Sequence, residues 1–266
     1  KVLLANALGE LCAAFSKSGE KSTLFYWVYV CSYMLQIYFD FSGYSDMAVG
    51  LGKLFGFSFP ENFDYPYISR SITEFWRRWH MTLSGWFRDY VYIPLGGSRT
   101  SKAKWLRNLL VVWMLTGLWH GASWNFVLWG LYFGVLLAVE KLLLKKTLDR
   151  APAAVCHAYV LFFVAVSFAI FSADGQGGVI PVLSGLFGLS GLPGYTFETG
   201  YYIRSYAVLL ATGAIGATPL LRKAWGRVKG RPFALWLEPL AAAALMAACT
   251  AALVDGSFNP FLYFRF

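Results

Sequence analysis

The longest stretch without a charged side chain runs from Asn108 to Val139 and contains His120 near its middle. A single helix of this length would reach about 48 Å, whereas the hydrocarbon core of a bilayer is about 30 Å thick. Small residues interrupt the stretch around the histidine, at Gly117, Gly121, Ala122 and Ser123. The pattern therefore predicts a hairpin of two helices that enters the membrane, turns beside His120 and returns.

Other apolar segments predict further membrane helices. Uncharged runs long enough to span a bilayer lie at Ser22–Phe39, Ala151–Ala173, Ser205–Leu221 and Pro239–Val254. The segment Met47–Phe59 is glycine-rich and predicts one more short membrane helix. The region 174–198 is rich in glycine and nearly free of charge, which favours a re-entrant or surface-lying segment over a straight helix.

A different pattern covers Ile72–Tyr90, where apolar residues recur at helical spacing along one face. These are Ile72, Phe75, Trp76, Trp79, Leu83, Trp86, Phe87 and Tyr90. The opposite side carries Arg70, Arg77, Arg78 and Arg88. A helix with tryptophan on one face and arginine on the other is expected to lie in the membrane interface. His80 falls on the border between the two faces.

The composition supports a membrane protein. The 266 residues are 58% hydrophobic and only 14% charged, whereas about 25% of the residues of a soluble domain are charged. The formal net charge of +9 collects in short segments at 99–107, 141–150 and 222–231. Basic loops remain on the cytoplasmic side of a membrane, so these clusters indicate the topology of the chain. We therefore expect no nucleic-acid partner, which would need the charges on one water-exposed surface.

These loops predict a consistent topology in contact with membrane lipid. Both ends of the hairpin face the cytoplasm; the chain leaves at 151, returns by 221 and leaves again at 239. The aromatic tail Asn259–Phe266 is then expected outside, anchored at the interface. The four cysteines lie singly in apolar segments without metal or redox spacing. We expect one membrane-embedded domain over residues 1–266, with no metal and no bound cofactor.

Several motifs carry a resemblance to a known family. They are Tyr38-Phe-Asp-Phe-Ser-Gly-Tyr-Ser-Asp-Met-Ala-Val-Gly-Leu-Gly52, Pro60-Glu-Asn-Phe-Asp-Tyr-Pro-Tyr67, Thr73-Glu-Phe-Trp-Arg-Arg-Trp-His80, Trp86-Phe-Arg-Asp-Tyr-Val-Tyr-Ile-Pro-Leu-Gly-Gly97 and Gly117-Leu-Trp-His-Gly-Ala-Ser-Trp-Asn125. The chain resembles the bacterial branch of the membrane-bound O-acyltransferases, most of all those that O-acetylate alginate. Other members of this branch acetylate peptidoglycan or pass D-alanine to teichoic acid. The likeness is dense over about 36–140 and recurs in the tail.

The resemblance implies an all-α, polytopic fold with re-entrant and interfacial helices around a tunnel, in the bacterial cytoplasmic membrane. Family members are longer, with more spans before the first motif, so this chain corresponds to the C-terminal portion of the pattern. The resemblance also implies a cytoplasmic acyl donor, an acetyltransferase partner outside and a polysaccharide acceptor. The histidine of the family's Trp-His-Gly motif, taken as catalytic, falls on His120, and a second motif histidine falls on His80.

The residues themselves fit acyl transfer from a thioester to a hydroxyl. A buried imidazole is kept neutral because desolvation disfavours imidazolium, so His120 can accept the acceptor's proton. Trp119, Trp124 and Asn125 are predicted to shape the pocket, with Asn125 donating to the oxyanion. The alternative is a core histidine whose nitrogens are satisfied by neighbours.

The segment before the hairpin supplies further candidates. We predict that His80 orients His120, binds the donor or lines the cytoplasmic mouth, with Trp76 beside it; alternatively it is an ordinary interfacial residue. Positive charge at Arg77, Arg78 and Arg88 suits the phosphates of coenzyme A or a phosphopantetheine carrier, or else the lipid headgroups. Asp40 and Asp46 could complete a histidine metal site, but capping of helix ends or pairing with arginine is favoured.

The sequence therefore predicts an O-acyltransferase that moves an acetyl or similar short acyl group across the membrane to a cell-envelope polysaccharide. No Gly-x-Ser-x-Gly motif is present, which favours direct transfer over a covalent enzyme intermediate. A transporter or channel with His120 as proton relay or gate is the second hypothesis. An inactive scaffold, lacking the family's N-terminal part, is the third.

Overall fold

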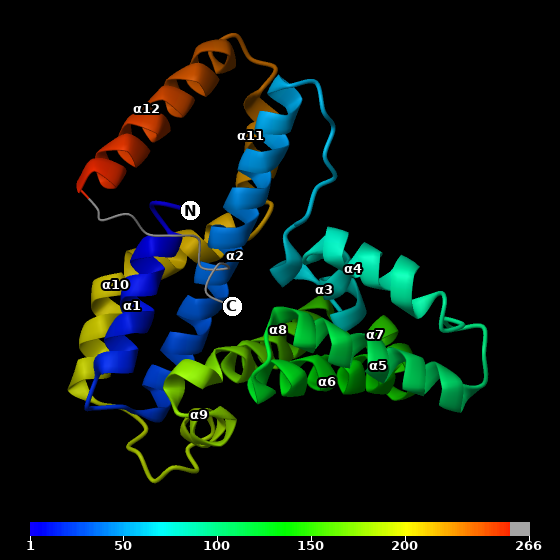
Figure 1. Cartoon of the computed structure of the whole chain (residues 1–266). Coiled ribbons are helices and arrows are strands. Elements are labelled where there is room, and N and C mark those ends of the chain that lie inside the picture. Colours follow the sequence, from blue (N-terminus) through cyan, green and yellow to red (C-terminus); the bar gives the residue numbers. More distant parts are fainter. Residues whose placement is uncertain (256–266) are drawn as a thin grey trace.

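The structure is a computed structural model that describes residues 1–255; the predicted interfacial tail Asn259–Phe266 lies outside them. Every regular element of the described chain is a helix. Figure 1 shows α1, α2 and α10 side by side on the left of the view, and α5, α6 and α8 stacked across the right. The all-helical fold class predicted from the sequence is confirmed.

The α-helices are α1 (Ala5–Lys17), α2 (Thr23–Leu54), α3 (Ile72–Arg78), α4 (Met81–Phe87), α5 (Lys102–His120), α6 (Trp124–Val139), α7 (Lys145–Arg150), α8 (Ala153–Phe171), α9 (Val179–Leu186), α10 (Phe197–Gly216), α11 (Leu220–Val228) and α12 (Ala234–Asp255). Two π-helical turns, at Arg88–Tyr92 and Glu140–Leu144, extend α4 and α6. Short 3₁₀ turns lie at Pro66–Ile68 and Ser172–Gln176.

Helix α2 is longer than predicted and absorbs the separate helix expected at Met47–Phe59. The Ser22 hydroxyl accepts from the amide of Phe25 and caps its first turn. No proline follows until Pro60, and Asp40 stays inside the helix because it is buried opposite the Lys1 ammonium, 3.4 Å away. The helix ends only at Leu54, shortly before Gly56 adopts a left-handed φ of 81°.

The central hairpin is confirmed as two helices, α5 and α6, joined through Gly121–Ser123. Two glycines let the backbones of these helices touch. A Cβ on Gly117 would press on the carbonyl oxygen of Phe126, and one on Gly130 on that of Trp113. The sequence spacing of small residues thus sets how closely the two helices approach, and it fixes where His120 lies.

Three helical segments of the described chain are long and apolar enough to cross a membrane: Trp124–Arg150, Ala153–Gln176 and Ala234–Val254. The last two coincide with the spans predicted at Ala151–Ala173 and Pro239–Val254. The predicted span Ser205–Leu221 is instead divided between α10, which begins at Phe197 after the Thr196 cap, and the start of α11, which follows Pro219. In the glycine-rich region 174–198, the short helix α9 packs on α2 and α8, between the end of a 3₁₀ turn and the start of α10.

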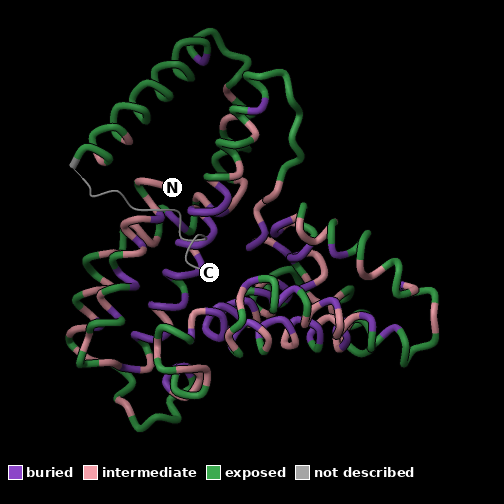
Figure 2. Tube along the Cα trace, in the orientation of Figure 1, coloured by how far each residue is buried: buried purple, intermediate pink, exposed green. Residues whose placement is uncertain are grey.

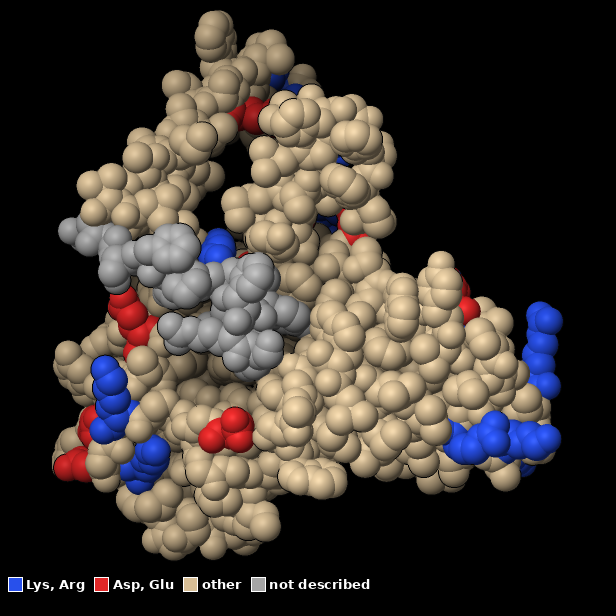
Figure 3. All heavy atoms as spheres, viewed as in Figure 1, with Lys and Arg blue, Asp and Glu red and all other residues tan. Residues whose placement is uncertain are grey.

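The distribution of charge and burial fits this arrangement. Figure 3 shows large areas without charged side chains; lysine and arginine gather at the right edge over the start of α5, and a second group of basic and acidic side chains lies at the lower left. Figure 2 shows buried residues along α2, α6 and α8, whereas α12 is exposed along nearly its whole length. An apolar helix that is exposed among the described residues is suited to a lipid environment.

Candidate active site

The imidazole of His120 lies at the end of α5 and is buried among aromatic rings, with 7% of the residue exposed. Ring centroids of Trp119, Trp129 and Phe171 lie 4.9, 5.0 and 5.3 Å from it, each nearly perpendicular to the imidazole. These rings come from α5, α6 and α8, so three apolar helices converge on the histidine. The site is water-poor, as the apolar pattern around His120 predicts.

Asn125 opens α6 and ties the hairpin to α8. Its side-chain amide donates to the carbonyl oxygen of Phe171 at 2.7 Å. Its buried Oδ1 has no hydrogen-bond partner among the described residues, and the same holds for Nε1 of Trp129. Asn125 and the exposed Trp124 line a cavity of about 350 Å³ together with Asp174. Buried polar atoms without partners are uncommon in native proteins and are the atoms a ligand would satisfy.

The predicted single helix over Ile72–Tyr90 is wrong, because the chain breaks at His80. Trp79 is extended and His80 is left-handed, with φ of 46°, so α3 ends at Arg78 and α4 begins at Met81. The break is held by the loop that precedes α3. The amide of Met81 donates to the carbonyl of Asn62, and the amide of Asp64 donates to the carbonyl of Arg78.

The break turns His80 into the protein instead of leaving it at a helix border. His80 is 7% exposed, and its ring lies 4.7 Å from Phe41 on α2 and 6.0 Å from Trp119 on α5. Trp119, which is half-exposed, therefore contacts both imidazoles. The two histidines predicted as catalytic are thus both brought against one indole.

The hydrogen bonds of Asn62 fix the tautomer of His80. Oδ1 of Asn62 accepts from both the backbone amide and the hydroxyl of Thr82, so this atom must be the oxygen. His80 Nδ1, 3.1 Å from the same oxygen, therefore carries a proton and donates it. In the neutral ring Nε2 is then the basic nitrogen.

Burial lowers the pKa of His80 to about 4, because desolvation disfavours imidazolium. The unfolded chain, with a histidine pKa near 6.5, takes up a proton between about pH 6.5 and 4 that the folded protein excludes. The folding stability contributed by neutral His80 is thus present above pH 6.5 and lost as the pH falls towards 4. We expect the melting temperature to fall over this interval, and to fall less in His80→Asn, which tolerates the left-handed backbone. An equal fall in both proteins would contradict this assignment.

The three predicted phosphate-binding arginines have different surroundings. The guanidinium of Arg78 is already paired within the protein. It donates to Glu74 at 3.0 Å and to the Asp64 carboxylate at 2.9 Å, and these bonds connect the preceding loop to α3. Arg88 is exposed and pairs with its neighbour Asp89, lowering the pKa of that carboxyl through the hydrogen bond. Arg77 has no ion pair within the described residues, and it lines a cavity of about 540 Å³.

Trp76 packs in the core and not on an open surface. Its indole contacts Trp113, Trp129 and Phe133, and its Nε1 has no hydrogen-bond partner in the described part of the chain. Asp40 pairs with the Lys1 ammonium, a partner that the sequence does not predict. No group of three or more histidine, cysteine or acidic residues able to hold a metal occurs within residues 1–255.

Sequence reasoning missed three residues that shape the site. Trp129 touches His120, and Asn62 orients His80. The buried carboxylate of Glu140 accepts hydrogen bonds from the first two backbone amides of α3. Asn62 lies in a motif already singled out, and its position before the α3 segment was the available signal. Glu140 follows the long uncharged run, and a carboxylate at that position is expected to be exposed to solvent at the end of a membrane helix.

Comparison with known proteins fits this geometry. The family model of the membrane-bound O-acyltransferases matches residues 14–175, which include both histidines and all of α5, α6 and α8. The chain belongs to the membrane-bound O-acyltransferase family. The resemblance drawn from the motifs is thereby confirmed.

Relatives with known names agree with the family. The probable alginate O-acetylase AlgI of Pseudomonas putida is 36% identical over 291 residues, covering 100% of this chain and 58% of the relative. The corresponding protein of Azotobacter vinelandii is 46% identical over 65% of this chain and 35% of its own length. A peptidoglycan O-acetyltransferase of Helicobacter pylori is 39% identical over 67% of this chain and 34% of its own length. The chain thus spans at most 58% of each of these three relatives.

Proposed function

We propose that this chain forms the catalytic part of an O-acyltransferase in the bacterial cytoplasmic membrane. The enzyme moves an acetyl or similar short acyl group from a cytoplasmic thioester towards a cell-envelope polysaccharide such as alginate, with His120 as general base. One observation supports the proposal: His120 and His80, 40 residues apart in the sequence, are both buried and both lie against the indole of Trp119.

The proposed reaction needs one proton acceptor. The acceptor hydroxyl attacks the thioester carbonyl carbon while His120 takes the hydroxyl proton. The tetrahedral oxyanion then collapses, the carbon–sulfur bond breaks, and the proton passes from His120 to the departing thiolate. Two buried groups support the oxyanion role: the Asn125 amide, whose nitrogen holds a second proton besides the one bonded to Phe171, and Trp129 Nε1, which has no partner among the described residues.

The two ends of the hairpin have different chemistry, which suits a reaction between two compartments. Arg77 lines a cavity beside the basic end, predicted to be cytoplasmic, where a coenzyme A or phosphopantetheine donor would arrive. Trp124 and Asn125 line the cavity at the other end, and Asn125 is hydrogen-bonded to Phe171, whose ring lies against His120. An extracytoplasmic acetyltransferase is the partner that would receive the acyl group and place it on the polymer.

The proposal is tested by supplying a labelled acetyl thioester to the full-length protein in lipid vesicles. An O-acyltransferase consumes the thioester and places the label on a hydroxyl acceptor or on water. A channel or transporter with His120 as proton relay would leave the thioester intact while conducting protons. Proton flux without thioester consumption would overturn the proposal.

A further inference from the structure

The cavity beside the basic end of the hairpin contains two cationic side chains, Lys141 and Lys145, to which the proposed reaction gives no role. It has a volume of about 540 Å³ and is built from α3, α5, the π-helical turn after α6, α7 and the turn after α4. We propose that this cavity is a phosphate-binding site formed by Arg77, Lys141 and Lys145, which holds a phosphate of the acyl donor. The assignment to the donor rests on the proposed function; the phosphate chemistry does not.

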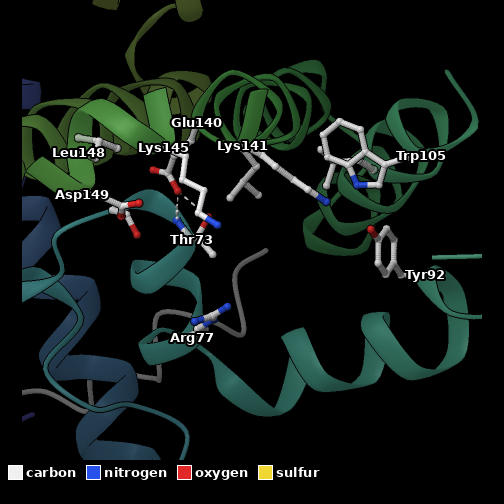
Figure 4. Close-up of a pocket in the computed structure, with 12 residues that line it drawn as sticks. Thr73, Arg77, Tyr92, Trp105, Glu140, Lys141, Lys145, Leu148 and Asp149 are labelled. Carbon is white, nitrogen blue, oxygen red and sulfur yellow. Dashed lines mark hydrogen bonds between the residues drawn. The ribbon is translucent and has the colours of Figure 1, made fainter. Parts of the chain in front are cut away.

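Three cations meet in this cavity without counter-ions. None of the three, Arg77, Lys141 and Lys145, forms an ion pair within the described residues. Figure 4 shows Arg77 reaching in from α3, while Lys141 and Lys145 come from the opposite side. Lys141 and Lys145 are four positions apart, where like charges on a helix repel. An anion bound between them would relieve that repulsion.

The two acidic residues of the cavity, Glu140 and Asp149, form no ion pair with its three cations in the described chain. The Glu140 carboxylate accepts from the amides of Ile72 and Thr73 at 2.6 and 2.9 Å and from the hydroxyl of Thr73. These bonds direct it to the positive end of α3 (Figure 4). Asp149 is exposed at the margin and forms no ion pair in the described chain. The free cationic groups therefore face the cavity.

The aromatic lining favours an organic phosphate. The Lys141 ammonium lies 4.3 Å from the ring centroid of Trp105, a cation–π contact that holds its long side chain in place. Tyr92 lines the same wall and gives the cavity a second aromatic surface beside the charged groups. Cations combined with aromatic surfaces suit a phosphate attached to an organic chain better than free inorganic phosphate.

The position of the cavity fits a donor with a long arm. Trp105 in the cavity and His120 are 15 residues apart on α5, so they are separated by about 22 Å along the helix. A phosphopantetheine chain has roughly the backbone length of four extended residues between phosphorus and sulfur, about 15 Å, and the reach of an arginine or lysine side chain adds to this. A phosphate at the basic end would therefore direct the thioester towards the histidine.

The experiment compares two probes that differ only in the phosphate. Binding of 4′-phosphopantetheine and of pantetheine is measured on the full-length protein in nanodiscs, for wild type and for Lys141→Gln/Lys145→Gln. The control is Lys146→Gln, which removes one lysine charge at a position next to the cavity lining but not part of it; Lys145→Gln alone is the variant of equal charge. Thermal unfolding of each variant verifies the fold, since all three lysines are exposed.

We expect wild type to bind phosphopantetheine at least 10-fold more tightly than pantetheine. The double variant should lose at least 10-fold in affinity for phosphopantetheine only, and the control should bind like wild type. A lipid headgroup is the other source of the same chemistry. In that case the double variant binds phosphopantetheine as tightly as wild type does but retains less phosphatidylglycerol. That result would assign the phosphate site to a lipid and would overturn its assignment to the acyl donor.

Unchanged binding of both phosphopantetheine and phosphatidylglycerol by the double variant would overturn the phosphate site. Failure of the proposed function looks different. The wild-type protein would then bind phosphopantetheine through the cavity while transferring no acetyl group from a thioester. The two outcomes are separated because binding is measured independently of turnover.

Discussion

Replacing His120 with alanine is expected to lower acetyl transfer by the full-length enzyme by about 10²–10⁴-fold, the range for loss of a general base. The three rings around the imidazole, from Trp119, Trp129 and Phe171, belong to three different helices. The loss should therefore fall on turnover at saturating donor, while the fold and the binding of the donor are retained. The measurement is the rate of label transfer from an acetyl thioester.

His157→Ala is the matched control, because it removes an imidazole from α8 outside this cluster. His157 Nδ1 lies 3.1 Å from the carbonyl oxygen of Ser69 and makes an ordinary structural hydrogen bond. This variant should keep transfer within a few-fold of wild type. Equal losses in His120→Ala and His157→Ala would indicate a structural role for both histidines.

The second large effect is expected at Glu140. Its carboxylate is buried and satisfies the amides of Ile72 and Thr73 at the first turn of α3, while the Ser71 hydroxyl accepts from the amide of Glu74. Glu140→Ala would leave two amides unpaired, at about 1–3 kcal/mol each. Because α3 is only seven residues long and leads into His80, its fraying should also displace that imidazole.

We therefore expect Glu140→Ala to unfold several degrees below wild type, to exchange the amides of α3 faster and to lose most acetyl transfer. Glu140→Gln keeps one acceptor oxygen and should be intermediate. Glu20→Ala is the control: Glu20 is exposed, and its carboxylate forms no ion pair in the described chain. Amide exchange in α3 that is as slow in Glu140→Ala as in Glu20→Ala would show that the carboxylate does not hold the helix.

The hairpin could be predicted from sequence because its signal is local. An uncharged run too long for one span, with small residues in its middle, leaves few alternatives. Gly121 and Ser123 do lie in the turn, and His120 lies at the end of the first helix. Burial of the histidine follows from the same apolar pattern.

The break at His80 could not be predicted, because it depends on contacts made by another segment. Residues on both sides of the break carry a good helical periodicity, and the interruption is stabilised by backbone bonds to Asn62 and Asp64. The continuity of α2 through Asp40 similarly depends on Lys1, which lies next to it only after folding. Tertiary contacts of this kind override a local pattern in either direction.

The central claim is that His120 moves a proton during acyl transfer, and imidazole rescue tests it most directly. The side chain is removed in full-length His120→Gly, and transfer of labelled acetyl from a thioester is measured as free imidazole is added. The account predicts a rate at least 10²-fold below wild type that rises and saturates with imidazole. A rate within a few-fold of wild type that does not respond to imidazole would contradict it.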